Sequence, residues 1–437
     1  MTETPLIVSR KEHQLSHRNI DEDALKVISR LHRHGHIAYL VGGGVRDLLL
    51  GKTPKDFDIG TSATTEEVRK LFRNSRIIGR RFPLNHVFFP GQKILEVSTF
   101  RSEAKLDSEG SDEVVETQKK TVHLTRTDNT YGTAESDALR RDLTINGLFY
   151  DPETRSVIDY VGGLEDLERG VIRMIGNPGQ RFNEDPVRMI RAIRHTARTG
   201  FVIEAETYDA LLGSVQLITL SATARIHEEF LRELNGGASC ASFRLMRVVG
   251  LLDHLLPGLE DFWAGRGKAQ WHITEEVLHR VDTLIGEGYV LSAGILLAAL
   301  AIGSVDRETL RRILGAEPSD LLMQLFEQAP HPRERELHYN PDFHLELDSR
   351  ELDEEVQLVL KGLYSRIGIT RNEREEITEC LKKRYLFLYE QSMLPRSPRA
   401  RLLVHLVDAA LAPPRAVDLI VQKTAPLRRR RRRKPHA

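Results

Sequence analysis

The chain has few cysteines, few aromatic residues and no long hydrophobic run. Two of its 437 residues are cysteines, and aromatic side chains make up 6%. Cys240 and Cys380 match no metal-binding spacing and supply no disulfide framework, which predicts a reducing compartment. The first residues, MTETPLIVSRKEHQ, lack the apolar core of a signal peptide. We therefore expect a cytoplasmic protein.

The apolar segments favour buried cores over membrane spans. The longest mostly apolar run, residues 289–305 (YVLSAGILLAALAIGSV), is short for a membrane span and predicts a buried core helix. A hydrophobic content of 40% is enough for real cores, and 29% charged residues indicate a soluble chain. Since 437 residues exceed what one core usually organises, two to four domains are expected.

The net charge of zero hides a strongly basic C-terminus. The chain has 63 basic and 63 acidic residues, but consecutive basic residues occupy Arg428, Arg429, Arg430, Arg431, Arg432, Arg433 and Lys434. Without these seven, 56 basic residues face 63 acidic ones, a net charge of −7. A terminal basic run suits sequence-independent binding of an RNA backbone. The alternative is an inert run that keeps the protein soluble.

Hydrophobic periodicity predicts a mixed N-terminal part and a helical remainder. Helices are predicted at 22–34, at 44–50 and after a cap at Thr64 or Thr65, and strands at 37–41, 56–60, 76–79, 85–89 and 93–100. Residues 37–101 thus form a compact α+β unit. The polar segment 102–133 predicts a long mobile loop. From about residue 134 onward the pattern is almost wholly helical.

The stretch GGGVRDLLLGKTPKDFDIG, residues 42–60, combines glycines with alternating aspartates. A P-loop would need glycine where Arg46 stands, and a dinucleotide-binding fingerprint would need glycine where Asp47 stands. Two readings remain. The stretch is either a site for a triphosphate and its metal ions, or a glycine-rich turn followed by a solvated acidic strand end.

Carboxylates recur in the predicted strands. If 56–60 is a strand, Asp56 and Asp58 point to the same face, where they repel each other unless a cation lies between them. Hard oxygen ligands with open positions suit Mg²⁺. Glu96 lies on a later strand between apolar neighbours. It is either a third carboxylate of a metal site or the partner of Arg101 or another arginine in a salt bridge.

Two later segments concentrate arginines and acids. ALRRDLTINGLFY (138–150) places Arg141 and Asp142 where a helix meets a turn, and RFNEDPVRMIRAIR (181–194) begins a helix. Arg188, Arg191 and Arg194 follow one another at three-residue spacing in that helix. Asp142 can be a simple helix cap and the arginines a solvated face. The arginines can equally line a nucleotide.

Together with EVSTFR and DYVGG, these segments resemble the class II nucleotidyltransferases, which comprise tRNA CCA-adding enzymes and bacterial poly(A) polymerases. The resemblance covers roughly residues 25–260 and rests on an ordered series of motifs. It implies an α+β fold, in which a small nucleotidyltransferase head with a mixed sheet and helices precedes an all-α neck, body and tail. The expected parts are an N-terminal extension (1–24), the catalytic head (25–160), a neck with a nucleobase-binding helix (161–237), an RNA-binding body and tail (238–390) and a basic, disordered extension (391–437).

The resemblance also implies roles for residues in the matched motifs. Asp56 and Asp58 would hold two Mg²⁺ ions, with Glu96 near the metals, and Asp142 is counted with the catalytic carboxylates. Asp185 and Arg188 would bind the edge of the incoming base of ATP. The remaining residues expected to bind the nucleotide are Gly42, Gly43, Gly44 and Arg46 along the triphosphate, Arg141 with Asp142 at the ribose, Arg191 and Arg194 at the pocket or phosphates, and Arg101 and Asn146.

The segment IIGRRFPLNHVFF (77–89) resembles the poly(A) polymerase form, because of Arg80, Arg81 and His86. Arg80 and Arg81, like the basic tail, are expected to bind RNA. The implied activity is Mg²⁺-dependent, template-independent addition of AMP from ATP to RNA 3′ ends in RNA processing and decay. Its partners would be the 3′ ends of generic RNA or tRNA, with RNA-decay proteins as candidate protein partners and no membrane. The alternatives are a CCA-, CC- or A-adding tRNA repair enzyme and an RNA-binding protein with an inactive head.

Overall fold

The structure, a computed structural model, describes residues 4–79, 83–102, 113–117, 120–124, 131–257 and 268–301, with short pieces at 357, 360, 366–378, 380–381 and 422–423. Contacts between Cα atoms divide the chain into two compact units, residues 1–217 and 218–437. The first unit carries the large sheet and the second is mainly helical in its described part. The mixed head followed by a helical region confirms the predicted fold class, whereas the finer domain boundaries remain predictions.

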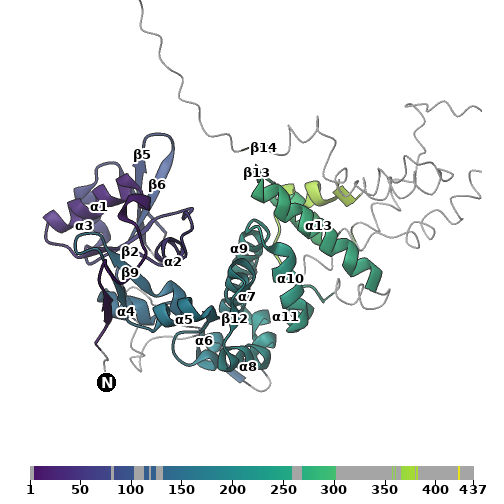
Figure 1. Cartoon of the computed structure of the whole chain (residues 1–437). Coiled ribbons are helices and arrows are strands. Elements are labelled where there is room, and N and C mark those ends of the chain that lie inside the picture. The colour runs from purple at the N-terminus through teal and green to yellow at the C-terminus, as the bar shows by residue number, and fades with distance from the viewer. Residues whose placement is uncertain are drawn as a thin grey trace, which may run out of the picture. The chain divides into compact units, whose positions relative to one another are not determined.

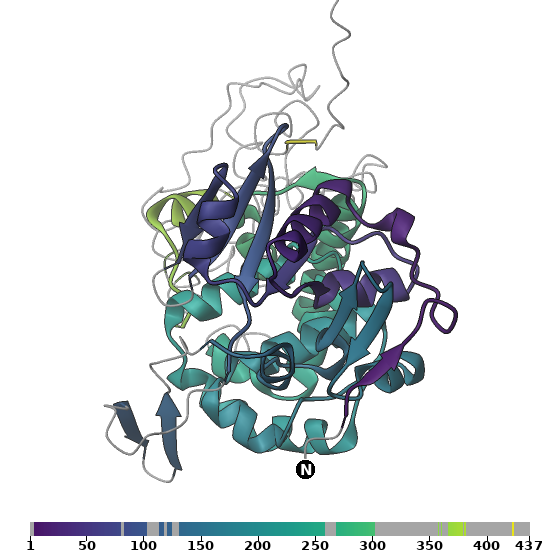
Figure 2. The ribbon, with the colours of Figure 1, turned by 90° about the vertical axis from the view of Figure 1, so that its left-hand side faces the viewer.

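The first unit is built on a sheet of eight strands in the order β1-β10-β9-β2-β3-β6-β5-β4. Figure 1 labels its strands β2, β5, β6 and β9. The strands are β1 Leu6–Val8, β2 Ala38–Val41, β3 Asp58–Thr61, β4 Ser75–Ile78, β5 Leu84–Phe89, β6 Lys93–Thr99, β9 Leu148–Asp151 and β10 Ser156–Asp159. Only the β3–β6 pair in this sheet is parallel. In both views, the β5–β6 hairpin projects beyond the helices next to it (Figures 1 and 2).

Helices pack on parts of this sheet and continue beyond it. They are α1 Glu22–Arg33, α2 Gly43–Leu49, α3 Thr65–Leu71, α4 Ala134–Leu139, α5 Gly163–Arg169, α6 Pro178–Glu184, α7 Val187–Thr199 and α8 Ala205–Ser214, with 3₁₀ turns η1 His17–Asn19, η2 Thr144–Asn146 and η3 Val215–Leu220. Helix α3 packs on β4, β5 and β6, and α2 packs on β2 and β9. The sheet therefore holds α2 next to the start of β3.

Local sequence signals explain several boundaries. Thr64 accepts a hydrogen bond from the backbone N–H of Glu67, whose side chain accepts from Thr64 in return, which completes a capping box at α3. This confirms the predicted cap. Asp21 caps α1 in the same way by accepting from the N–H groups of Asp23 and Ala24. Such caps satisfy backbone donors that have no partner within the helix.

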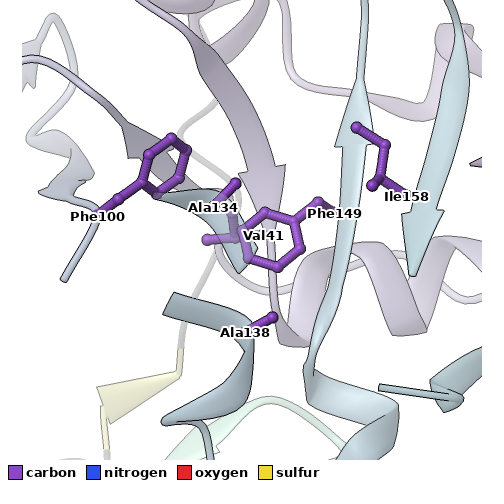
Figure 3. Packing of buried hydrophobic residues seen from close by; sticks show 6 residues of the cluster. All are labelled: Val41, Phe100, Ala134, Ala138, Phe149 and Ile158. Carbon is purple, nitrogen blue, oxygen red and sulfur yellow. The ribbon is translucent and has the colours of Figure 1, made fainter. Parts of the chain in front are cut away.

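An apolar cluster joins the sheet to α4. It contains Val41, Phe100, Ala134, Ala138, Phe149 and Ile158, all buried (Figure 3). The Phe100 and Phe149 rings meet edge-on, with centroids 6.2 Å apart. A Cβ atom at Gly60 on β3 would lie 2.7 Å from the Phe100 ring, so only glycine leaves room for the ring in this position. This packing fixes α4, and the arginines that follow it, against the end of β3.

Two predictions made from periodicity were wrong. The segment predicted as a long loop contains an antiparallel pair of strands, β7 Glu113–Thr117 and β8 Lys120–Leu124. The region predicted to be almost wholly helical supplies β9 and β10 to the main sheet, and β11 Val171–Ile172 pairs with β12 Val202–Ile203. These strands have two to five residues each. So short a run cannot show a clear period, and its pairing partners decide whether it becomes a strand.

The second unit consists mainly of packed helices in its described part. They are α9 Thr223–Leu234, α10 Ser239–Val248, α11 Leu251–Leu255, α13 Lys268–Gly286 and α14 Ala293–Ala301, together with the strands β13 Tyr289–Val290 and β14 Gln422–Lys423. Residues 294–301 of α14 are all buried, which confirms a core helix within the longest apolar run. No helix in the described residues is long and apolar enough to cross a membrane.

Candidate functional site

The glycine turn brings α2 against the acidic strand. Gly42 has a φ of 69°, which side chains rarely tolerate, and a Cβ there would lie 2.9 Å from Nη1 of Arg141. A Cβ at Gly44 would lie 3.2 Å from the backbone oxygen of Asp56. Glycine at these positions therefore allows the turn, Arg141 and the Asp56 backbone to meet closely.

Three carboxylates act on one another beside this turn. Asp58 is the first residue of β3, Asp56 is exposed just before the strand, and Glu96 lies on the neighbouring strand β6. Burial, together with the charges of Glu96 and Asp56, raises the pKa of Asp58 to about 6 against the opposing effect of Arg141. The predicted strand 56–60 begins only at Asp58, so Asp56 does not share a strand face with Asp58 as predicted. Electrostatics nevertheless link all three acids.

Glu96 pairs with a histidine rather than with the arginine considered from the sequence. Nε2 of His86, on the neighbouring strand β5, lies 3.3 Å from Oε1 of Glu96. Arg101 is buried and donates from Nη2 to the backbone oxygen of Pro83 at 2.7 Å. Glu96 is 52% exposed at its side chain and thus accessible to a ligand.

The acidic cluster fits a hard cation by its chemistry. In the part of the chain that the structure describes, no three His, Cys, Asp or Glu side chains form a complete cation cage. Mg²⁺ does not require one, since it is commonly bound through one or two carboxylates plus phosphate oxygens of the substrate. Asp56 and Asp58 would supply those carboxylates. Burial and the nearby charges of Glu96 and Asp56 disfavour the ionised form of Asp58, and a cation bound there would offset both effects.

Asp142 lies in a different electrostatic setting. Nε of Arg188 donates to its Oδ1 at 2.8 Å, and Nη1 of Arg191 donates to its Oδ2 at 2.6 Å. Burial raises the pKa of Asp142, but Arg191 and Arg188 lower it more strongly, to about 2. Among the described contacts, Asp142 has none with Asp56 or Asp58. Its carboxylate instead ties the end of α4 to helix α7.

Arg188 holds several groups together at the start of α7. Its Nη1 donates to the backbone oxygen of Arg181 and to Oε2 of Glu184, both at 2.9 Å. Its Nη2 makes no hydrogen bond to any residue that the structure describes, which leaves the two N–H donors of that nitrogen for a ligand. Asp185 lies between α6 and α7, where its backbone caps α6. Arg188 and Asp185 are therefore neighbours at the junction of the two helices.

A second polar cluster connects α2, η2 and α7. Nη1 of Arg46 donates to Oδ1 of Asn146 at 2.6 Å and lies 3.2 Å from Nδ1 of His195. Nδ2 of Asn146 lies 3.2 Å from Nε2 of the same ring. A neutral imidazole has one acceptor nitrogen, whereas Arg46 and Asn146 each place a donor next to a ring nitrogen of His195. These two donors are therefore one more than the ring can accept. An excess donor suits a site that binds an anion.

Sequence reasoning missed His195 and Asp137. Burial lowers the pKa of His195 well below its ordinary value, and Arg46, Arg194 and Arg198 lower it further. Asp137, buried on α4, accepts from Arg140 and Arg141 through its two carboxylate oxygens. The i,i+4 spacing of Asp137 and Arg141 was the signal that could have found this pair. No local signal marked His195, because its partners are 49 and 149 residues away.

The structure thus groups the predicted residues into two neighbouring sets. Asp56, Asp58, Glu96, Arg141 and the glycines form one set, and Arg46, Asn146, Asp142, Arg188 and Arg191 form the other. Arg194 is buried in α7, apart from the Asp142 contacts. The predicted RNA-binding residues Arg80 and Arg81, and those of the tail at 428–434, lie outside the described residues.

Two segments of the chain match models of known protein families. The family described as the poly A polymerase head domain matches residues 38–173, and that described as a probable RNA and SrmB-binding site of polymerase A matches residues 200–262. Residues 38–173 of the chain are thus similar to this head domain. Both sets of candidate site residues lie within residues 38–173, except Arg188 and Arg191, which lie on α7 after the matched head domain.

Relatives divide into two groups. The chain is 44% identical to poly(A) polymerase I of Escherichia coli O6:H1 over 67% of this chain and 63% of that protein, so it spans less than two thirds of that relative. It is 35% identical to the CCA-adding enzyme of Bacillus pumilus over 54% of this chain and 55% of that protein. Among solved structures, a tRNA nucleotidyltransferase in complex with a primer tRNA and an incoming ATP analogue is 23% identical to this chain. The two structures align over 82% of this chain and 98% of that one, with a TM-score of 0.50. That likeness supports the fold alone.

Proposed function

We propose that this chain is a poly(A) polymerase that adds AMP from ATP to RNA 3′ ends without a template and releases pyrophosphate. It would act on RNA in the cytoplasm, in RNA processing and decay. The observation that carries the proposal is the cluster of Asp56, Asp58 and Glu96 against the Gly42 turn and Arg141. Higher identity to poly(A) polymerase I than to CCA-adding enzymes favours this activity over tRNA repair.

The residues divide the chemical work between them. Asp56 and Asp58 would hold Mg²⁺, which would lower the pKa of the RNA 3′-hydroxyl and stabilise negative charge on the triphosphate. We propose that two such ions bind. Arg141 and the N–H groups at Gly42–Gly44 would orient the phosphates. Glu96 lies on β6, and β3 separates β6 from β2, the strand that leads into the glycine turn. If the triphosphate lies at the glycine turn, the 3′-hydroxyl would approach from the β6 side.

Base choice without a template must come from protein groups. Adenine offers an N6 donor and an N1 acceptor on its pairing edge. The proposal assigns the first to Asp185 and the second to Arg188, whose Nη2 has no described partner and remains available to donate. A base that left these groups unpaired would be discriminated against strongly.

A tRNA-end repair activity is the second candidate, since the same head occurs in the CCA-adding relatives. The decisive experiment offers the purified full-length protein each NTP separately, with either a generic RNA or a tRNA that lacks its CCA end. The proposal expects ATP-dependent extension of both RNAs by many residues. Addition limited to CCA, CC or a single A on tRNA would establish repair instead. No incorporation on any RNA would support an inactive RNA-binding protein.

A further inference from the structure

A row of side chains crosses the outer sheet from the carboxylates to the edge strand. Strand pairing places Arg76 on β4 opposite His86 on β5, and His86 opposite Glu96 on β6. Strands β3 and β6 are parallel, and Ile59 pairs with Val97. Asp58 and Glu96 each come directly before one member of this pair, so they occupy matching positions on the two strands. Side chains that face each other across neighbouring strands lie on the same face. The row therefore runs from Asp58 to the sheet edge.

This face of the outer sheet is open on all three strands, whereas its other face is packed on β5 and β6 and exposes Ile77 (41%) on the edge strand β4. Ile78 and Ile94 are 42% and 45% exposed on the same face as His86. Val87 and Leu95 point the opposite way and are buried. Helix α3 packs on β4, β5 and β6, where it covers such inward-facing residues. Large apolar side chains are therefore presented to solvent next to the candidate site.

Aromatic and basic groups occupy the middle of this face. The rings of His86 and Phe88 lie edge to face, with centroids 6.3 Å apart. The guanidinium of Arg76 lies 5.8 Å from the centroid of Phe88. An open sheet face that presents aromatic rings and an arginine is a common platform for unpaired bases, which stack on the rings while the arginine meets phosphates or stacks as well.

We propose that the outer sheet face, formed by Arg76, Ile78, His86, Phe88 and Ile94, binds the last unpaired nucleotides of the RNA whose 3′ end is extended. The inference rests on the proposed function and adds the path of the RNA. Its strongest support is continuity. The row ends at Glu96 and Asp58, where the 3′-hydroxyl must lie, while the groups assigned to ATP lie across β3 at the glycine turn and on α7.

The test compares neighbouring residues on opposite faces in the full-length protein. Phe88→Ala should raise the KM for a short single-stranded oligoadenylate roughly tenfold, the loss expected from one stacking contact. The KM for ATP, and kcat at saturating RNA, should stay unchanged. Phe89→Ala is the matched control, because Phe89 is the next residue of β5 and points to the other face. Arg76→Ala and the exposed neighbour Arg73→Ala make a second pair.

Cross-linking locates the RNA directly. An oligoadenylate with 4-thiouridine next to its 3′ terminus should cross-link to the peptide that contains residues 84–89, and the same label at the 5′ end should not. Equal effects of the Phe88 and Phe89 variants on RNA KM, or cross-links only elsewhere, would overturn the inference. Failure of the proposed function is distinct. In that case the wild-type protein adds no AMP, while anisotropy with labelled RNA still tells whether this face binds RNA.

Discussion

Asp58 and Asp142 lie within one candidate site, yet their pKa values shift in opposite directions. Burial and the neighbouring acids raise that of Asp58 to about 6, whereas two arginines outweigh burial at Asp142 and lower its pKa to about 2. Asp58 is therefore costly to ionise and Asp142 stabilises the fold when ionised. A carboxylate that destabilises its own fold at neutral pH is a candidate for function rather than for stability.

Asp58→Asn should abolish AMP addition and yet raise the melting temperature near pH 8 in the absence of Mg²⁺. The folded state holds the Asp58 proton more tightly than the unfolded chain, so the wild type loses stability as the pH rises from about 4 to about 6. The asparagine variant does not lose stability in this way, because its side chain does not titrate. Thermal melts of both proteins across this pH range, in EDTA, measure the difference in melting temperature.

The matched control is Asp142→Asn, which should lower stability near neutral pH by about 3 kcal/mol, because it removes the negative charge between two arginines and leaves one of them facing an amide NH2 instead of an acceptor. In the wild type, the stabilisation from Asp142 is present above pH 4 and is lost as the pH falls to about 2. If both asparagine variants shifted the melting temperature in the same direction at pH 8, the electrostatic assignment would be wrong.

Arg188→Ala should reduce the preference for ATP over CTP as well as the rate. Arg188 has a donor nitrogen without a described partner and lies beside Asp185 at the start of α7. Arg191→Ala is the control, since Arg191 contacts the same carboxylate of Asp142 from one turn further along α7. It should lower the rate without altering the preference. Competition assays with mixed nucleotides measure both, and unchanged preference in Arg188→Ala would assign this residue to structure or to phosphate binding.

At the scale of elements, the site depends on how closely α2, β3, α4 and α7 approach one another. Gly42 and Gly44 allow α2 to approach Arg141 and the Asp56 backbone. The Arg46, Asn146 and His195 cluster joins α2 and η2 to α7. Arg181 adds a further connection, since its Nη2 donates to the backbone oxygens of Arg140 and Arg141 at the end of α4.

Gly42→Ala should lower both activity and stability, whereas Gly51→Ala should lower only stability. Both glycines have a φ of 69°, so alanine costs each about 1–2 kcal/mol of backbone strain. A Cβ at Gly42 also meets Arg141, while nothing lies within 4 Å of one at Gly51. Denaturant unfolding and steady-state kinetics separate the two effects. Equal loss of activity in both variants would show that strain alone explains the result.

His195→Phe should raise the KM for ATP roughly tenfold, because Arg46 loses a hydrogen-bond partner that helps to orient it. We treat His195 as a positioning residue that acts through Arg46. His195→Asn, which restores an acceptor, should recover part of the affinity for ATP, and kcat should change less than KM in both variants. A similar KM for the two variants and the wild type would remove His195 from this role.

At the scale of the whole molecule, basic charge is concentrated in a tail far along the chain from the site. Truncation after Pro426 should weaken binding of generic RNA and flatten its salt dependence, while incorporation at saturating RNA persists. Each lost phosphate contact should remove about 0.7 from the log–log salt slope for single strands. Affinity across a salt series measures this. An unchanged slope would leave the seven basic residues as a solubilising run.

The sequence by itself determined the elements whose signals are local and the motif series that carries the family resemblance. The Thr64 cap, α1, β2 and the buried α14 follow from nearby residues, so they could be predicted. Only the tertiary structure decided which strands pair. It added β9 and β10 to the head sheet, placed Glu96 beside His86 and enclosed Asp142 between two arginines of α7. These contacts join residues far apart in the chain, and their energies depend on burial and charge that exist only after folding.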